Sequence, residues 1–165
     1  MSTRKIITNS AKETQEMAAK FAGQILRKNP GNTAMVLALQ GDLGSGKTTF
    51  LQGFAKGLGI KEKILSPTFV ILKRFKIPPK SKISNNRRPS IIRDMYFYHI
   101  DCYRLNSSRE ILDLGFKEII SNPQNIVAIE WPERIKSILP RSTILIKFKH
   151  LDKNNRNIDI YTQLD

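Results

Sequence analysis

The chain has 165 residues, which suits one domain with a substantial core and leaves no room for a second large one. Hydrophobic residues make up 40% and charged residues 25%, and no apolar run approaches the roughly 18 residues that span a bilayer, so we expect no membrane protein. The 28 Lys and Arg residues against 14 Asp and Glu residues give a net charge of +14, which favours RNA or acidic protein surfaces as partners, although it could also serve solubility alone.

The N-terminus and the cysteine content indicate a compartment. Residues 1–8 lack the apolar stretch of a secretory signal, and Cys102 is the single cysteine, which excludes an intrachain disulfide. We therefore expect a cytoplasmic protein with Cys102 in its core.

The first elements in chain order are a short strand at residues 5–8 and an amphipathic helix. Ser10 and Glu13 have the spacing of a capping box, and apolar residues follow at helical period. Residues 34–39 form a continuous apolar run, which is typical of a strand buried on both faces of a parallel sheet. A second helix is predicted at residues 48–58.

The remaining elements alternate around a basic loop, rich in proline and serine, that is inserted at about residues 76–93. A further helix is predicted at residues 108–120, and strands at residues 69–75, 96–101, 126–129, 143–148 and 157–161. The last two strands have a polar connection typical of a β-hairpin. We expect one three-layer α/β domain over residues 1–165, with a central mixed sheet that has a parallel core and a C-terminal antiparallel hairpin.

A phosphate-binding motif lies between the strand at 34–39 and the following helix. Residues 41–48 match G-x-x-x-x-G-K-[ST], in which glycines let backbone N–H groups turn toward phosphate oxygens at the positive end of a helix. Lys47 is expected to reach the β- and γ-phosphates, and the Thr48 hydroxyl to coordinate Mg²⁺. The motif predicts a P-loop NTPase-like domain that binds ATP through Asp42, Leu43, Gly44, Ser45, Gly46, Lys47, Thr48 and Thr49.

A P-loop needs an acidic group on a neighbouring strand to hold magnesium or orient water. Glu130 closes the apolar run at 126–129 and is the best candidate by position, although such a residue could also be a solvent-facing carboxylate. Asp101 ends the strand at 96–101 and could approach the same phosphates. It could equally start a loop or pair with Arg104.

Four blocks in order resemble the TsaE family of small bacterial ATPases: residues 41–49, Ser66-Pro67-Thr68-Phe69, His99-Ile100-Asp101-Cys102-Tyr103-Arg104-Leu105 and Ile129-Glu130-Trp131-Pro132. The resemblance covers about residues 5–161. It implies an ATPase needed to make N6-threonylcarbamoyladenosine (t6A) in tRNA, which docks on the TsaB and TsaD subunits of the threonylcarbamoyl transferase. It also implies that ATP hydrolysis resets that complex between turnovers.

The resemblance also implies roles for single residues. Lys47 and Thr48 match the Walker A pair, Glu130 the Walker B acid that would bind magnesium, and Asp101 the acid of the H-x-D-x-Y-R block. Thr68 matches a nucleotide-sensing segment, where its hydroxyl could follow the γ-phosphate, although a proline-led turn into a strand explains the same residues.

Three further positions carry weaker implications. Trp131 matches an aromatic residue beside the active site, but a lone tryptophan is often simply packed in a core. Glu13 and Arg156 match positions near the nucleotide. Helix capping and surface charge explain these two residues equally well.

The sequence departs from the family at residues 73–93, where relatives have a short hairpin. The segment has no acidic residue and contains Lys73, Arg74, Lys76, Lys80, Lys82, Arg87, Arg88 and Arg93. Basic loops bind phosphate backbones, so the hypothesis is that this segment contacts tRNA within the transferase complex. A solvated insertion without a ligand is the alternative, because aromatic stacking residues are absent from its middle.

Two other functions share the P-loop. A small-molecule kinase would usually have an arginine-containing lid, and no helical framing for one surrounds the basic loop. A GTPase-type module should carry an Asn-Lys-x-Asp block after the acidic strand, and the sequence lacks it. Competition between ATP and GTP would separate the GTPase reading from an ATPase.

Overall fold

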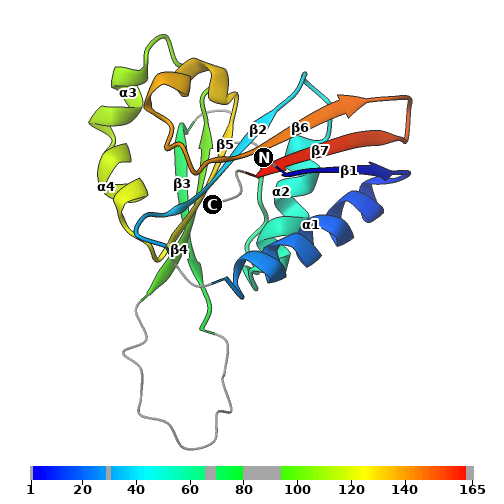
Figure 1. Cartoon of the computed structure of the whole chain (residues 1–165), viewed down its shortest axis with the longest axis horizontal. Helices are drawn as coiled ribbons and strands as arrows, with labels where there is room; N and C mark the ends of the chain where they lie inside the picture. The colour runs from blue at the N-terminus through cyan, green and yellow to red at the C-terminus, as the bar shows by residue number, and fades with distance from the viewer. Residues whose placement is uncertain (1, 29–30, 66–69, 80–93, 163–165) are drawn as a thin grey trace, which may run out of the picture.

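The computed structural model describes residues 2–28, 31–65, 70–79 and 94–162, and its helices flank a seven-stranded sheet (Figure 1). The elements in chain order are β1 (Ser2–Thr8), α1 (Ala11–Ile25), β2 (Met35–Gln40), α2 (Lys47–Gly57), β3 (Leu72–Ile77), β4 (Met95–Asp101), α3 (Ser108–Asp113), α4 (Phe116–Ser121), β5 (Asn125–Glu130), the 3₁₀ helix η1 (Pro132–Ile138), β6 (Ile144–His150) and β7 (Arg156–Thr162).

The strand order is β1-β7-β6-β2-β5-β4-β3. β2 pairs in parallel with both β5 and β6, and β4 pairs in parallel with β5. β7 is antiparallel to β6 and to β1, and β3 is antiparallel to β4. This confirms the predicted mixed sheet with a parallel core and a C-terminal antiparallel hairpin.

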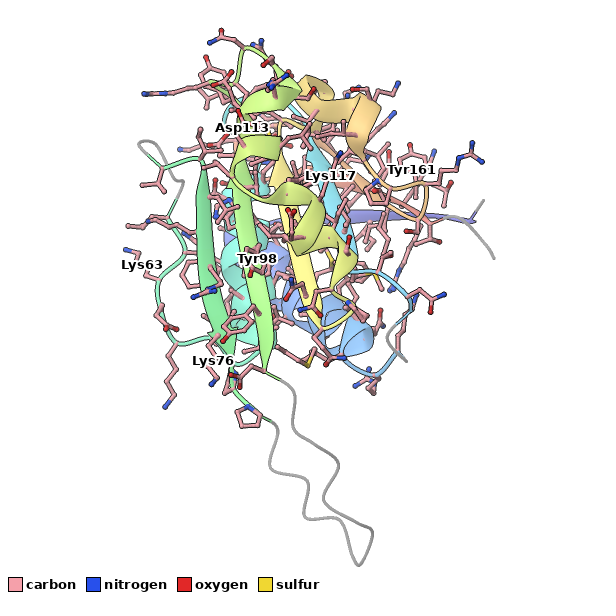
Figure 2. The ribbon with its side chains drawn as sticks, turned by 90° about the vertical axis from the view of Figure 1, so that its left-hand side faces the viewer. Lys63, Lys76, Tyr98, Asp113, Lys117 and Tyr161 are labelled. Atoms are coloured by element: carbon pink, nitrogen blue, oxygen red, sulfur yellow. The ribbon has the colours of Figure 1, made fainter. Side chains whose placement is uncertain are left out.

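Two apolar cores lie on opposite faces of the sheet and make the fold three-layered. On one face Leu37 packs with Phe50 and Phe54 under α1 and α2. On the other face Val36 and Phe116 belong to a core covered by α3, α4 and η1. Figure 2 views this second face, with Asp113 and Lys117 on the two helices and Tyr98 on β4. The two sides are also separated in Figure 1.

Helices α1 and α2 approach each other closely because α2 carries glycines where they meet. A Cβ atom on Gly53 would overlap the backbone of Gln15, and one on Gly57 would lie 2.5 Å from the carbonyl oxygen of Ala19. The start of α1 is fixed by the Ser10 hydroxyl, which accepts a hydrogen bond from the Glu13 N–H. The N-terminal helix was therefore correctly predicted.

Several predicted boundaries were wrong. β3 begins at Leu72 rather than at residue 69 and continues to Ile77, so part of the expected basic loop is strand. The helix predicted at 108–120 is two helices, because Gly115 adopts a left-handed conformation with φ 81° that ends one and starts the next. η1 was not predicted.

The search for membrane-crossing segments covered the described residues. None of their helices combines the length and the apolar character that crossing a bilayer requires.

Candidate active site

The glycine-rich loop follows β2 at the edge where the parallel strands β2, β4 and β5 end. Gly41 has φ 153°, and a Cβ atom there would lie 2.6 Å from the carbonyl oxygen of Phe148 on β6 and 2.8 Å from Oγ of Ser45. Gly46 has φ 104° and stands immediately before α2. Both positions require glycine, so the chain can wrap the space in front of the helix N-terminus.

Lys47 is the first residue of α2 and is only 5% exposed. Its Nζ donates hydrogen bonds to the carbonyl oxygens of Gly41, at 2.6 Å, and Asp42, at 2.9 Å. It also lies 4.4 Å from the centroid of the Trp131 ring. Burial lowers the pKa of Lys47, and the nearby carboxylates of Glu130 and Asp101 oppose this shift.

Glu130 ends β5 and is 3% exposed. Its Oε1 accepts a hydrogen bond from Nε2 of His99 at 2.9 Å, and His99 is fully buried on β4. Registry explains the contact: Asp101 is the β4 partner of Glu130, and His99 lies two residues earlier on the same face of β4.

Asp101 ends β4 beside Glu130. Its Oδ1 accepts a hydrogen bond from the Tyr103 N–H at 2.9 Å. Burial raises the pKa of Asp101, and the negative charge of Glu130 raises it further, while the Tyr103 N–H and Lys47 lower it. Two carboxyl groups thus face a single lysine across the loop.

An open cavity of about 550 Å³ joins these groups. Trp131 and Tyr103 form one wall, with ring centroids 5.0 Å apart. Trp131 has φ 58°, a conformation that few residues other than glycine adopt. The cavity is lined by the predicted residues Leu43, Gly44, Ser45, Gly46, Lys47, Thr48, Thr49, Asp101, Glu130 and Trp131, and also by Val70, Ile71, Tyr103, Arg104 and Glu110.

The other predicted residues lie at different places. Asp42 presents its carbonyl oxygen to Lys47, and the Arg156 side chain passes 3.8 Å from the position of a Cβ on Gly46. Glu13 does not line this cavity and accepts hydrogen bonds from the N–H and side chain of Asn9. Thr68 lies outside the described residues. The nucleotide contacts of Glu13, Arg156 and Thr68 stay predictions.

His99, Tyr103 and Glu110 were not identified as site residues from the sequence. His99 and Tyr103 stand in the H-x-D-x-Y-R block, so their position in that block was the available signal. Glu110 accepts hydrogen bonds from the N–H groups of Asn106 and Ser107 at the start of α3, a capping pattern that gave no hint of a cavity.

The interior of the glycine-rich loop fits a phosphate group. Oγ of Ser45 is buried inside the loop, and no described residue hydrogen-bonds to it. Among the described residues no three His, Cys, Asp or Glu side chains cluster as metal ligands. The binding of magnesium by Thr48 and Glu130 stays a prediction from the sequence.

Similar proteins identify the family of the chain. The family model described as threonylcarbamoyl adenosine biosynthesis protein TsaE matches residues 8–158. The chain belongs to the TsaE family. The TsaE protein of Rickettsia prowazekii is 36% identical over 156 residues, which are 94% of this chain and 92% of that protein. The TsaE protein of Bacillus subtilis is 34% identical over 155 residues, which are 94% of this chain and 81% of its own length.

The fold is similar to that of a solved structure as well. The crystal structure of YdiB from Bacillus subtilis superposes with a TM-score of 0.70 at 28% identity, covering 98% of this chain and 86% of that chain. Both curated relatives carry the name tRNA threonylcarbamoyladenosine biosynthesis protein TsaE. The TsaE membership predicted from the four sequence blocks is thereby confirmed.

Proposed function

We propose that this TsaE protein is a Mg²⁺-dependent ATPase that supports formation of t6A in tRNA, acting in the cytoplasm with the TsaB–TsaD threonylcarbamoyl transferase. The observation that carries the proposal is the meeting of Lys47, Thr48 and Glu130 in one cavity at the ends of β2 and β5. The names of its relatives support the tRNA pathway.

The P-loop residues bind and orient ATP. Backbone N–H groups of the loop and of the N-terminus of α2 donate hydrogen bonds to phosphate oxygens, and the Ser45 hydroxyl gains a partner. Lys47 exchanges the carbonyl oxygens of Gly41 and Asp42 for phosphate oxygens, which suits a buried cation better because they carry full negative charge.

The two carboxylates would hold the metal and orient the attacking water. Thr48 and Glu130 would hold magnesium, which supplies neutralisation of the phosphate charge that develops during transfer. Asp101 lies next to Glu130, and burial raises its pKa, so its carboxyl group is suited to orient a water or accept its proton. Trp131 and Tyr103 cover one side and limit the access of bulk water.

The proposed TsaB and TsaD partners rest on the resemblance of the four sequence blocks. The charge of +14 agrees with an acidic docking face or with nearby tRNA. Within the basic segment at 73–93, Lys76 forms an ion pair with Asp94 at 2.9 Å, and the Arg74 guanidinium lies 4.8 Å from the Tyr96 ring. Residues 80–93 lie outside the described part of the chain. Their contact with tRNA stays a hypothesis.

ATP hydrolysis by the purified chain, alone and with TsaB and TsaD, tests the proposal. Hydrolysis should need Mg²⁺, increase with the pair, and fall about 100-fold or more in Lys47→Ala and Glu130→Ala. Lys56→Ala and Glu118→Ala change exposed residues of the same types and should have no effect. A hydrolysis rate that TsaB and TsaD do not change, or phosphate transfer to a small acceptor, would contradict the proposal and favour a kinase.

A further inference from the structure

We infer that His99 is a positioning residue of the nucleotide site, which fixes the carboxylate of Glu130 through a hydrogen bond to Oε1. The inference rests on the proposed function, because it assigns how the magnesium-binding carboxylate is held. An ionised carboxylate only accepts hydrogen bonds, so Nε2 of His99 carries the hydrogen in the 2.9 Å contact.

The surroundings of His99 do not explain a histidine on packing grounds. The side chain is fully buried, and Phe97, two residues earlier on the same face of β4, belongs to the apolar core under α1 and α2. Nδ1 of His99 is buried without a hydrogen-bond partner among the described residues. Burying a polar ring with one nitrogen unpaired costs stability, so an apolar residue would pack here at less cost.

The hydrogen bond of the His99 ring goes to Glu130, and it fixes one carboxylate oxygen. Oε1 of Glu130 is hydrogen-bonded to Nε2 of His99, and Glu130 is only 3% exposed. A glutamate side chain has three rotatable torsions, and one strong contact at a buried carboxylate removes most of that freedom. His99 thus holds the Glu130 carboxylate in a fixed place before the metal arrives.

This arrangement predicts that loss of His99 weakens magnesium binding but not metal-free nucleotide binding. Lys47 and the loop amides bind phosphates whether or not Glu130 is well placed, so nucleotide affinity without metal should not depend on His99. Binding of magnesium to the nucleotide complex should depend on it, because Glu130 is the carboxylate proposed to hold the metal. A general loosening of the fold would weaken both steps alike.

The test uses fluorescence of Trp131, the single tryptophan, which lies in the cavity wall. The full-length protein is titrated with a non-hydrolysable ATP analogue in EDTA, and the complex is then titrated with Mg²⁺. The variants are His99→Leu, which removes the donor, and His99→Gln, whose amide can donate from a similar place. Ile100→Ala is the matched control, because Ile100 is fully buried on the opposite face of β4.

His99→Leu should raise the Mg²⁺ midpoint about 10- to 100-fold and leave the affinity in EDTA within about twofold, while His99→Gln should recover most of the loss. Thermal unfolding of each free variant shows that the comparison is made on folded protein. An unchanged midpoint in His99→Leu, or an equal rise in Ile100→Ala, would overturn the role of His99 alone. A wild-type complex that does not respond to Mg²⁺ would overturn the metal site and this inference together.

Discussion

The Ser45 hydroxyl is buried in the P-loop, and no described residue hydrogen-bonds to it. A buried hydroxyl without a partner destabilises a protein by about 1 to 3 kcal/mol relative to a satisfied one. The unpartnered hydroxyl therefore lowers the stability of the free protein. It would gain a partner when a phosphate group binds in the loop. Lys47 is in a comparable position, since burial lowers its pKa.

Ser45→Ala should leave the free protein as stable as wild type, or more stable by up to about 1 kcal/mol, because the unsatisfied hydroxyl is removed. The same change should weaken ATP binding, because a hydrogen bond to phosphate is lost. Urea unfolding of the free protein and ATP titration of its fluorescence measure the two effects. A clear loss of stability in the free protein would show that Ser45 Oγ has a structural partner.

Cys102 illustrates a residue whose burial serves packing only. The side chain is 0% exposed in the core under α3 and α4, and burial raises the pKa of its thiol to about 12. In the unfolded chain the thiol ionises near its ordinary value of 9.0. The contribution of the buried neutral thiol to stability is therefore fully present below pH 9. It is lost as the pH rises toward 12, because only the unfolded chain can release the proton easily in that range.

The folded protein should consequently react with iodoacetamide at pH 8 far more slowly than the urea-unfolded chain, since neither thiolate nor access is available. Mass spectrometry of timed samples measures the rate. Between pH 9 and pH 10.5, the free energy of unfolding of Cys102→Ala should fall less than that of the wild type. Labelling of the native protein as fast as that of the unfolded chain would contradict the burial of Cys102.

Helix α2 follows the P-loop and packs against α1. The glycines of α2 set the distance between the two helices. Gly53→Ala should destabilise the protein by about 1 to 3 kcal/mol or more, because the new methyl group would overlap the Gln15 backbone. Gly23→Ala is the control of opposite sign: the nearest atom to its Cβ is 3.9 Å away, and helix propensity favours alanine by about 1 kcal/mol. Thermal melts of both variants test this, and a stabilising Gly53→Ala would refute the close packing.

Elements fixed by local sequence were predicted well. The apolar run of β2, the glycine pattern and the Ser10 cap each act within a few residues, so the strand, loop and helix around Lys47 follow from the sequence. The predicted position of Glu130 at the end of a buried strand is also observed, since β5 ends there beside β2, while its role as a metal ligand stays a prediction.

Features that depend on distant pairing were not predicted. The contact of His99 with Glu130 needs the registry between β4 and β5, which no local pattern encodes. The pairing of β1 with β7 joins the two ends of the chain. The break at Gly115 and the turn at Trp131 depend on left-handed backbone conformations that tertiary packing selects.

At the scale of the whole molecule, the proposed ATP site would serve a tRNA-modifying complex. The site lies on one edge of the sheet, at the ends of β2, β4 and β5, and its cavity is open to solvent on that side. A partner docking there would contact the same wall that Trp131 and Tyr103 form. Nucleotide hydrolysis and docking are therefore expected to influence each other.

The most direct measurement is t6A formation over many turnovers in a mixture of TsaB, TsaD, tRNA and the activated threonylcarbamoyl donor. Wild-type protein with ATP and Mg²⁺ should sustain t6A formation beyond one equivalent of complex, whereas Lys47→Ala should not and Lys56→Ala should. If Lys47→Ala sustained turnover as well as the wild type, ATP hydrolysis at this P-loop would not be the protein's contribution to t6A formation.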